Sequence, residues 1–363
     1  MTRTLTDGMH KRQRLDRRVN LHYYATRNGG SIKMSKSLRR IFLFVFFAFF
    51  AANPLPAQEK LTVSYSSVDA PSANWYIAQE KGFYKKYGLD VESIFIPASS
   101  TNVAVLVAGQ LKFGNGTGGT IASAAVSGAN LVAVACFMNT LPYELIVQDS
   151  IKTKEQLKGK SIGISRIGSS SDVVARVFLR NLGLEPDKDV AIIQVGGAGE
   201  RAAAFRTGRI AAFPAPPGVL HLTKGMPQRV LISTADFQKP YPFPYICGTT
   251  TKSYLAANRP TVRRLVMALS EGSHFFKTRK EESKQILAKY SRQNEPAYLE
   301  AAWDVNAKLF DRVPYVTREG MDIQLKDALA KKPSSTVKVD DIVDDTIVAE
   351  LEKEGFFDRL YKP

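Results

Sequence analysis

Apolar segments of strand length alternate with amphipathic segments of helix length along most of this chain. The first such unit contains an alternating strand at 61–65, a helix at 73–86 that carries Trp75 and Tyr76, and a second strand at 89–96. Apolar strands separated by helices are typical of parallel sheets covered by helices. The pattern therefore predicts an α/β fold.

Two series of such units follow one another, and a helical tail follows the second. The first series continues with a helix at 101–108, a short strand at Phe113, a helix at 119–127 and a strand at 131–137. The second contains strands at 144–148, 160–165, 190–195, 210–213 and 229–233, with helices at 153–157, 170–181, 199–207 and 219–224. After Gly248 we predict helices at 260–277, 281–290, 296–309, 317–329 and 341–354.

The two series share a detail at corresponding positions. In each, a helix ends at a glycine, Gly109 or Gly208, and a brief apolar strand follows. Glycine readily adopts the left-handed conformation that ends a helix. Turns of this kind are common in general, but their matching places favour two similarly built lobes.

The two series are joined by segments rich in proline and aromatic residues, at 139–143 and 240–245. Proline fixes its own backbone angle and restricts the residue before it, so these segments predict a stiff hinge of two strands of chain. The first lobe is expected to comprise 58–141 and 248–363, and the second lobe 142–247.

The first 57 residues have the character of an export leader. An unbroken apolar run at 41–52 precedes small residues that end at Ala57. The basic residues before this run are Lys33, Lys36, Arg39 and Arg40. This order predicts a signal peptide cleaved after Ala57, because the run is shorter than the roughly 20 residues of a membrane span. An uncleaved anchor is the alternative. Translation is expected to start at Met34, unless 1–33 form a translated basic tail.

Removing the leader changes the charge balance. The whole chain has a net charge of +16, but residues 1–57 hold 11 Lys and Arg against two Asp and Glu. The remainder has 39 against 32, a net charge of +7, with both signs interspersed. A nucleic-acid-binding protein would present a basic stripe, often with aromatic residues. We therefore expect no nucleic-acid partner.

Few residues of the chain suit metal or catalytic chemistry. Only His221 and His274 lie outside the leader, and the two cysteines are Cys136 and Cys247. We expect neither a metal nor a cofactor. Each cysteine lies beside one crossing between the lobes, so a disulfide could join the hinge strands, but buried free thiols are the favoured interpretation.

Three glycine-containing segments resemble catalytic or nucleotide motifs only in part. The segment 114–120 lacks the Gly-Lys-Ser/Thr ending of a phosphate-binding loop. The segment 168–170 lacks the second glycine of a nucleophile elbow. The segment 196–201 opens a helix after a strand, but no acidic partner follows the next strand, so we interpret it as a tight turn near the cleft. No catalytic residue is predicted.

The opening unit, with the order of elements from about Lys60 onward, resembles solute-binding proteins of ABC importers. The branch is the SsuA/THI5-like one, which takes sulfonates, taurine, nitrate and thiamine precursors. The segments that carry the resemblance are Trp75-Tyr76-Ile77-Ala78, Lys81-Gly82-Phe83-Tyr84, Tyr87-Gly88 and Leu89-Asp90-Val91. The resemblance implies a two-lobed periplasmic-binding-protein fold of type II, with a mostly parallel sheet in each lobe and a tail packed on the first lobe.

The same resemblance implies a function. A monomer outside the cytoplasm, in the periplasm, would close its hinge around a small anionic organic solute: a sulfonate, nitrate, a carboxylate or a pyrimidine precursor. It would then deliver the solute to a membrane permease and its ATPase, without chemistry. Two alternatives share the fold. One is an enzyme resembling thiamine-pyrimidine synthases, whose cysteine-rich motif and active-site histidine have no counterpart here, and the other is a ligand-sensing domain.

Ligands of open parallel sheets bind beyond the carboxyl ends of the strands, where helix N-termini attract anions. The loops at those positions are rich in small and hydroxyl-bearing residues. The candidate ligand-binding residues are Ser66, Ser67, Asn74, Trp75, Ser99, Thr117, Asn139, Arg166, Ser169, Ser170 and Ser171. Arg166 would supply a full positive charge. The serines could equally be helix caps and Arg166 a solvated surface residue. For Trp75, a place in the core is the favoured interpretation.

Overall fold

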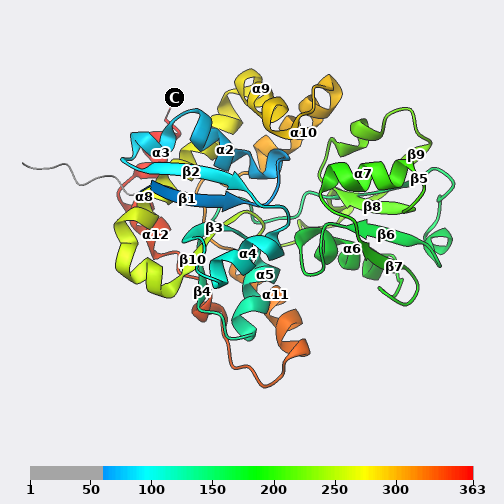
Figure 1. The fold of residues 1–363 in the computed structure, drawn as a ribbon, viewed down its shortest axis with the longest axis horizontal. Helices are drawn as coiled ribbons and strands as arrows, with labels where there is room; N and C mark the ends of the chain where they lie inside the picture. Colours follow the sequence, from blue (N-terminus) through cyan, green and yellow to red (C-terminus); the bar gives the residue numbers. More distant parts are fainter. Residues whose placement is uncertain (1–59, 363) are drawn as a thin grey trace, which may run out of the picture. The chain divides into compact units, whose positions relative to one another are not determined.

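The computed structural model describes residues 60–362. The predicted signal segment at 41–52, its cleavage point at Ala57 and the start at Met34 lie outside these residues. Within 60–362, two five-stranded sheets carry helices on their faces, and each sheet forms the centre of one lobe (Figure 1).

The sheet of the first lobe has the strand order β2-β1-β3-β10-β4. Its strands are β1 (Lys60–Tyr65), β2 (Asp90–Phe95), β3 (Phe113–Gly116), β4 (Leu131–Cys136) and β10 (Cys247–Thr251). Strand β1 is parallel to β2 and β3, and β10 is antiparallel to both of its neighbours. The buried positions Val63 and Phe113 are paired across β1 and β3, so large apolar side chains meet at the centre of the sheet.

The helices that follow these strands are short. They are η1 (Ala70–Ser72), α2 (Ala73–Glu80), α3 (Phe83–Lys86), α4 (Ser99–Val107) and α5 (Gly118–Val126). The single helix predicted at 73–86 is divided into α2 and α3. The reason is Gly82, whose φ of 69° is left-handed and interrupts the helical path.

The sheet of the second lobe has the order β7-β6-β8-β5-β9. Its strands are β5 (Glu144–Gln148), β6 (Ser161–Ile164), β7 (Ala191–Gln194), β8 (Ala212–Ala215) and β9 (Gln228–Ser233). Its helices are η2 (Lys154–Leu157), α6 (Ser170–Asn181), α7 (Ala198–Arg206), η3 (Val219–Thr223) and η4 (Thr234–Asp236). Strand β5 is antiparallel to β8 and β9, whereas β6 is parallel to β7 and β8.

The two sheets have the same plan. In each, the strand that follows a crossing, β10 or β5, is the antiparallel strand in the fourth position. Gly109 and Gly208 have φ of 71° and 72° and precede β3 and β8, which both occupy the third position. The prediction of two similarly built α/β lobes with mostly parallel sheets is confirmed. The exact residue boundaries of the lobes stay a prediction.

Strand β10 was not predicted, because its sequence does not alternate in polarity. It is nevertheless buried between β3 and β4. Its small residues fit this narrow place: a Cβ on Gly248 would lie 2.7 Å from the ring of Phe113. The chain thus begins its return to the first lobe with a central strand rather than with a helix.

The two crossings run side by side and are hydrogen-bonded to each other. The backbone N–H of Phe243 donates to the carbonyl of Asn139 at 3.0 Å. Two residues on, the N–H of Tyr245 donates to the carbonyl of Met138 at 2.9 Å. The paired crossings have the arrangement that a two-segment hinge requires.

Cys136 and Cys247 form a disulfide, so the favoured interpretation of free thiols is wrong. The two residues face each other in the register of β4 and β10, and both are fully buried. The bond joins the chain just before the first crossing to the chain just after the second. Since β10 was not predicted, the two thiols could not be placed opposite each other from the sequence.

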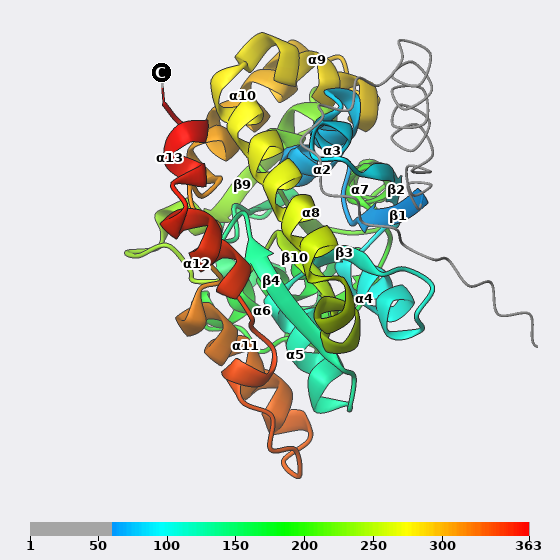
Figure 2. The same ribbon diagram turned by 90° about the vertical axis from the view of Figure 1, so that its left-hand side faces the viewer.

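The C-terminal tail is helical and packs largely on the first lobe (Figure 2). Helix α8 runs along α2 and touches β4 and β10, while α11 lies against α5. The tail helices are α8 (Lys252–Thr278), α9 (Lys280–Ser291), α10 (Pro296–Leu309), α11 (Arg318–Lys331), η5 (Val339–Asp341), α12 (Thr346–Lys353) and α13 (Phe356–Leu360). Gly272 permits the closest approach of α8 to α2, because its Cβ would lie 2.4 Å from the carbonyl oxygen of Asn74.

Besides its packing on the first lobe, the tail also touches the second lobe. Helix α10 contacts η3. The contact is close at Gly218, where a Cβ would lie 2.9 Å from the carbonyl oxygen of Tyr298 and 3.2 Å from the amide nitrogen of Ala302. The two lobes therefore meet at this contact as well as at the crossings.

Replacing Gly218 with Ala is expected to lower the free energy of unfolding by about 1–3 kcal/mol more than Gly225→Ala does, which is the usual cost of overpacking. Both glycines have positive φ, 96° and 88°, but nothing lies within 4 Å of a Cβ on Gly225. The difference between the variants in urea denaturation isolates the contact with α10. Equal losses in the two variants would show that this contact contributes nothing.

Between residues 60 and 362, no helix is both long enough and apolar enough to cross a membrane. Over the same residues, no group of three or more His, Cys, Asp and Glu side chains is arranged to hold a metal ion.

Candidate functional site

A cavity of about 240 Å³ lies between the loops of the two lobes. The first lobe contributes the loops after β1 and β2, and the second contributes the loops after β6 and β7. Its lining residues are Ser66, Ser67, Val68, Asp69, Phe95, Pro97, Ala98, Ser99, Tyr143, Ser165, Ser170, Ser171, Gly197, Ala198, Gly199, Glu200, Arg201, Leu222, Tyr245, Ser291 and Gln293. The cavity thus lies beyond the carboxyl ends of parallel strands in both sheets, where ligands of such sheets bind.

Five of the eleven predicted site residues line this cavity. They are Ser66, Ser67, Ser99, Ser170 and Ser171. The first three come from the first lobe and the last two from the N-terminus of α6. Ser99 is buried, and its hydroxyl has no hydrogen-bond partner among the described residues. Binding of a solute by these five residues stays a prediction.

Three other predicted residues lie inside the first lobe, away from the cavity lining. Asn74 and Trp75 are fully buried in α2. The Trp75 ring lies 5.7 Å from that of Phe113, so the structure places it in the core. Thr117 caps α5, since its hydroxyl accepts a hydrogen bond from the backbone N–H of Thr120. The placement of Trp75 agrees with the core interpretation.

Asn139 lies in the first crossing, and its side-chain amide forms hydrogen bonds to the tail. Its amide nitrogen donates to the carboxylate of Asp311 and to the carbonyl of Tyr315, each at 2.8 Å. Its amide oxygen accepts from the backbone N–H of Thr317 at 2.9 Å. The side chain thereby fastens the crossing to the tail and does not line the cavity.

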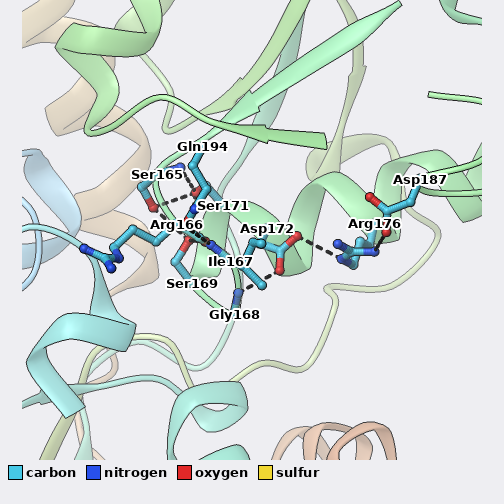
Figure 3. A network of polar contacts seen from close by, with 10 residues as sticks. All are labelled: Ser165, Arg166, Ile167, Gly168, Ser169, Ser171, Asp172, Arg176, Asp187 and Gln194. Atoms are coloured by element: carbon cyan, nitrogen blue, oxygen red, sulfur yellow. Dashed lines mark hydrogen bonds and ion pairs between the residues drawn. The ribbon is translucent and has the colours of Figure 1, made fainter. Parts of the chain in front are cut away.

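Arg166 and Ser169 follow β6 but do not line the cavity either. Arg166 is exposed, and Figure 3 shows its side chain extending away from the neighbouring serines. Ser169 is buried directly behind the lining. Its hydroxyl lies 2.7 Å from that of Ser165 and 3.0 Å from that of Ser171. Ser169 therefore positions two lining serines.

The loop that carries these serines is fixed from its other side by Asp172. The carboxylate accepts a hydrogen bond from the backbone N–H of Gly168 at 2.7 Å and one from Nε of Arg176 at 2.8 Å (Figure 3). Arg176 also pairs with Asp187 at 2.6 Å. This network holds the N-terminus of α6 and its serines at the cavity.

The positive charge of the cavity belongs to Arg201, which was not among the predicted site residues. Arg201 lies in the first turn of α7 and is only 3% exposed. Its Nη1 donates to the carbonyl of Gly196 at 2.8 Å, and its Nε has no hydrogen-bond partner among the described residues. No carboxylate of residues 60–362 forms an ion pair with it. Burial lowers the pKa of Arg201, but an arginine keeps its charge in proteins.

The direction of helical side chains explains why Arg201 reaches the cavity. Side chains of a helix tilt toward its N-terminus, so an arginine in the first turn folds back over the start of the helix. The hydrogen bond of Arg201 to Gly196, the residue before the helix, shows this direction. The segment 196–201 gave a usable signal: a glycine turn after a strand, followed by an arginine in the first helical turn.

The first lobe contributes an acidic group, Asp69, which was also not predicted. One carboxylate oxygen accepts a hydrogen bond from the hydroxyl of Ser67 at 2.8 Å, and the other accepts a long one from the hydroxyl of Tyr298 at 3.5 Å. Burial raises the pKa of Asp69, and the two hydroxyl donors and the charge of Arg201 oppose that shift only in part.

Two tyrosines line the cavity beside the hinge. The hydroxyl of Tyr143 lies 2.9 Å from that of Tyr245 and 3.2 Å from that of Ser170. Burial raises the pKa of Tyr143 and of Tyr245, so both stay neutral and can donate hydrogen bonds. Since Tyr143 and Tyr245 are the last residues of the two crossings, the hinge and the cavity share these side chains.

The cavity adjoins an open aromatic hollow. The hollow is lined by Tyr65, Tyr290 and Phe95, and Phe95 also lines the cavity. Phe95 is 43% exposed, which is unusual for so large an apolar side chain in this protein. The polar cavity therefore has an apolar mouth on the side of the first lobe.

The arrangement is suited to holding a small anion without a metal. The first N–H groups of a helix have no partner within the helix and carry partial positive charge, and α6 and α7 both begin at the cavity. Arg201 adds a full charge with an unpartnered donor. Serine and tyrosine hydroxyls complete a set of donors from both lobes.

The model of the NMT1/THI5-like family matches residues 70–283, more than half of the chain. A relative from Brucella abortus (strain 2308), whose name describes it as a binding protein, is 27% identical over 252 residues. The match covers 67% of this chain and 75% of the relative.

Two solved structures show the fold. The periplasmic aliphatic sulphonate binding protein SsuA from Escherichia coli superposes with a TM-score of 0.60 and 21% identity, over 78% of this chain and 90% of SsuA. The periplasmic nitrate-binding protein NrtA from Synechocystis PCC 6803 gives 0.67 and 17%, over 83% and 90%. The fold is that of the periplasmic binding proteins, as the resemblance implied. The chain belongs to the NMT1/THI5-like family.

Proposed function

We propose that this protein is the solute-binding component of an ABC-type importer. It captures a small organic anion between its lobes by hinge closure and releases it unchanged to a membrane permease with its ATPase. The solute classes that fit are sulfonates, carboxylates and related small anions. The protein acts as a monomer outside the cytoplasm.

The observation that carries this proposal is the buried, unpaired arginine of the cavity. A charge removed from water without a partner is costly, so a buried Arg201 favours a ligand that supplies the missing anion. The cavity is also divided between the lobes: Ser66, Ser67 and Ser99 belong to one, and Ser170 and Arg201 to the other. A solute that touches both groups stabilises the closed arrangement.

The location is supported by two features of the chain. The basic and apolar leader at 1–57 has the order of a secretion signal. The disulfide of Cys136 and Cys247 is of a kind that persists in oxidising compartments such as the periplasm. The structurally similar proteins SsuA and NrtA are described as periplasmic binding proteins, which agrees with this location and with a permease as partner.

A thermal-shift screen of the purified protein tests the proposal. A solute at 100 times its dissociation constant should stabilise the folded state by about 2.7 kcal/mol, and small anions should be the effective class. Small-angle scattering with and without the effective solute should show compaction, because closure brings the lobes together. Turnover of the solute, or a scattering profile that no solute changes, would contradict the proposal.

A further inference from the structure

The cavity carries charges of both signs, and they come from different lobes. Arg201 belongs to α7 of the second lobe, while Asp69 precedes η1 of the first. They are close enough to influence each other's pKa, yet they form no ion pair in the part of the chain that the structure describes. The protein thus holds two opposite charges apart across the space between its lobes.

The hydrogen-bond partners of Asp69 carry no charge, and the charge of Arg201 across the cavity offsets the effect of burial on its pKa only in part. Its carboxylate accepts hydrogen bonds from the hydroxyls of Ser67 and Tyr298, which are both neutral. The charged residue nearest in sequence to Arg201 is Glu200, which also lines the cavity and raises the pKa of Asp69 further. Burial and Glu200 both disfavour the charged form of Asp69. A cation close to Asp69 would stabilise that form, and no described residue supplies one within ion-pair distance.

Arg201, in the second lobe, carries a positive charge that lacks an anionic partner within residues 60–362. Its Nη1 donates a hydrogen bond to the carbonyl of Gly196, and its Nε has no hydrogen-bond partner among the described residues. The N-termini of α6 and α7 lie on the same side and also favour negative charge. The second lobe therefore offers a site for an anion, while the first lobe offers a site for a cation at Asp69.

We propose that the solute is a zwitterion, with its anionic group toward Arg201 and a protonated nitrogen toward Asp69. The inference rests on the proposed function and narrows its substrate class. A simple anion would satisfy Arg201 but would leave the carboxylate of Asp69 buried beside a second negative charge, which disfavours binding. A zwitterion neutralises both groups and links the two lobes through opposite ends of one molecule. The cavity of about 240 Å³ limits it to a small molecule.

Matched pairs of solutes test the inference on the full-length protein. The pairs are 2-aminoethanesulfonate with ethanesulfonate, and 3-aminopropanoate with propanoate, measured by calorimetry beside a panel of other anions, cations and zwitterions. The amino member of a bound pair should bind at least about tenfold more tightly, because only it reaches Asp69. In Asp69→Asn this preference should fall to about twofold or less. Asp149→Asn, at an exposed residue outside the cavity lining, should keep it.

The outcomes separate this inference from the proposed function. If simple anions bind as tightly as their amino counterparts, or if Asp69→Asn tightens their binding without changing the preference, the solute is not a zwitterion and the proposed function stands. If no member of the panel binds, both are wrong. The comparison within each pair uses the unaltered protein, so it holds even if Asp69→Asn folds poorly.

Discussion

Replacing Arg201 with Gln is expected to weaken the binding of an anionic solute by about 10- to 100-fold. Hydrogen bonds to a charged group contribute about 1.5–3 kcal/mol, and each 1.4 kcal/mol changes affinity tenfold. Glutamine keeps a polar side chain of moderate length but removes the charge and the planar fork that matches a carboxylate or sulfonate. Titration calorimetry with the stabilising solute measures the change directly.

Arg166→Gln is the matched control, since it removes the same charge from the same lobe. Arg166 is exposed and lies outside the cavity lining, so its replacement should change affinity by about twofold or less. The comparison also decides between the two arginines, because Arg166 is the one that the sequence suggested. A large loss in Arg166→Gln with full affinity in Arg201→Gln would overturn the assignment of the anion site.

Removal of the disulfide is expected to lower the free energy of unfolding by about 2–4 kcal/mol. The bonded residues are separated by 111 positions, and the loop that they close contains the whole second lobe. Long closed loops restrict the unfolded chain most strongly, so their removal is costly. The double variant Cys136→Ala with Cys247→Ala should therefore unfold at a lower urea concentration than the parent protein.

A reducing agent provides the control for this prediction. It should destabilise the parent protein by about the same amount and leave the double variant unchanged, because the variant has no disulfide to lose. If the parent protein under oxidising conditions is as stable as the double variant, the bond is either absent in solution or without effect on stability. Intact mass after alkylation, with and without reduction, distinguishes these two cases.

The α/β fold could be predicted because the patterns that indicate it lie within short segments of the sequence. Apolar runs of strand length and helical patterns can be recognised directly in the sequence. The glycines before β3 and β8 mark the end of a helix at the same point of both lobes. Strand β10 could not be found this way. Its Cys-Gly-Thr-Thr-Thr sequence does not alternate, and its strand conformation depends on β3 and β4 on either side. The disulfide was mispredicted for the same reason, since it depends on the register of β10 against β4.

The location of the site could be predicted from the sequence, but not all of the residues that line it. The rule that ligands bind beyond the carboxyl ends of parallel strands placed Ser66, Ser67, Ser99, Ser170 and Ser171 at the cavity. It could not say which way a loop side chain turns. Arg166 comes two residues after β6, and its exposed side chain extends away from the serines, as Figure 3 shows. Arg201 lies in the first turn of α7, and its side chain folds back over the start of that helix.

Asp69 illustrates a second limit. An aspartate before a short helix has an obvious local explanation as a cap, but its side chain forms no such hydrogen bond here. One of its hydrogen-bond partners is Tyr298, more than two hundred residues away in the tail. Contacts of this range follow from the packing of α10, which no local pattern shows.

A crystal structure of the full-length protein with the solute that stabilises it most tests the central claim directly. The account predicts an anionic group of that solute within hydrogen-bond distance, about 2.7–3.2 Å, of the Arg201 guanidinium, with serines of both lobes in contact. A solute bound outside the cavity between the lobes, or bound there with Arg201 free of any contact to it, would contradict the account.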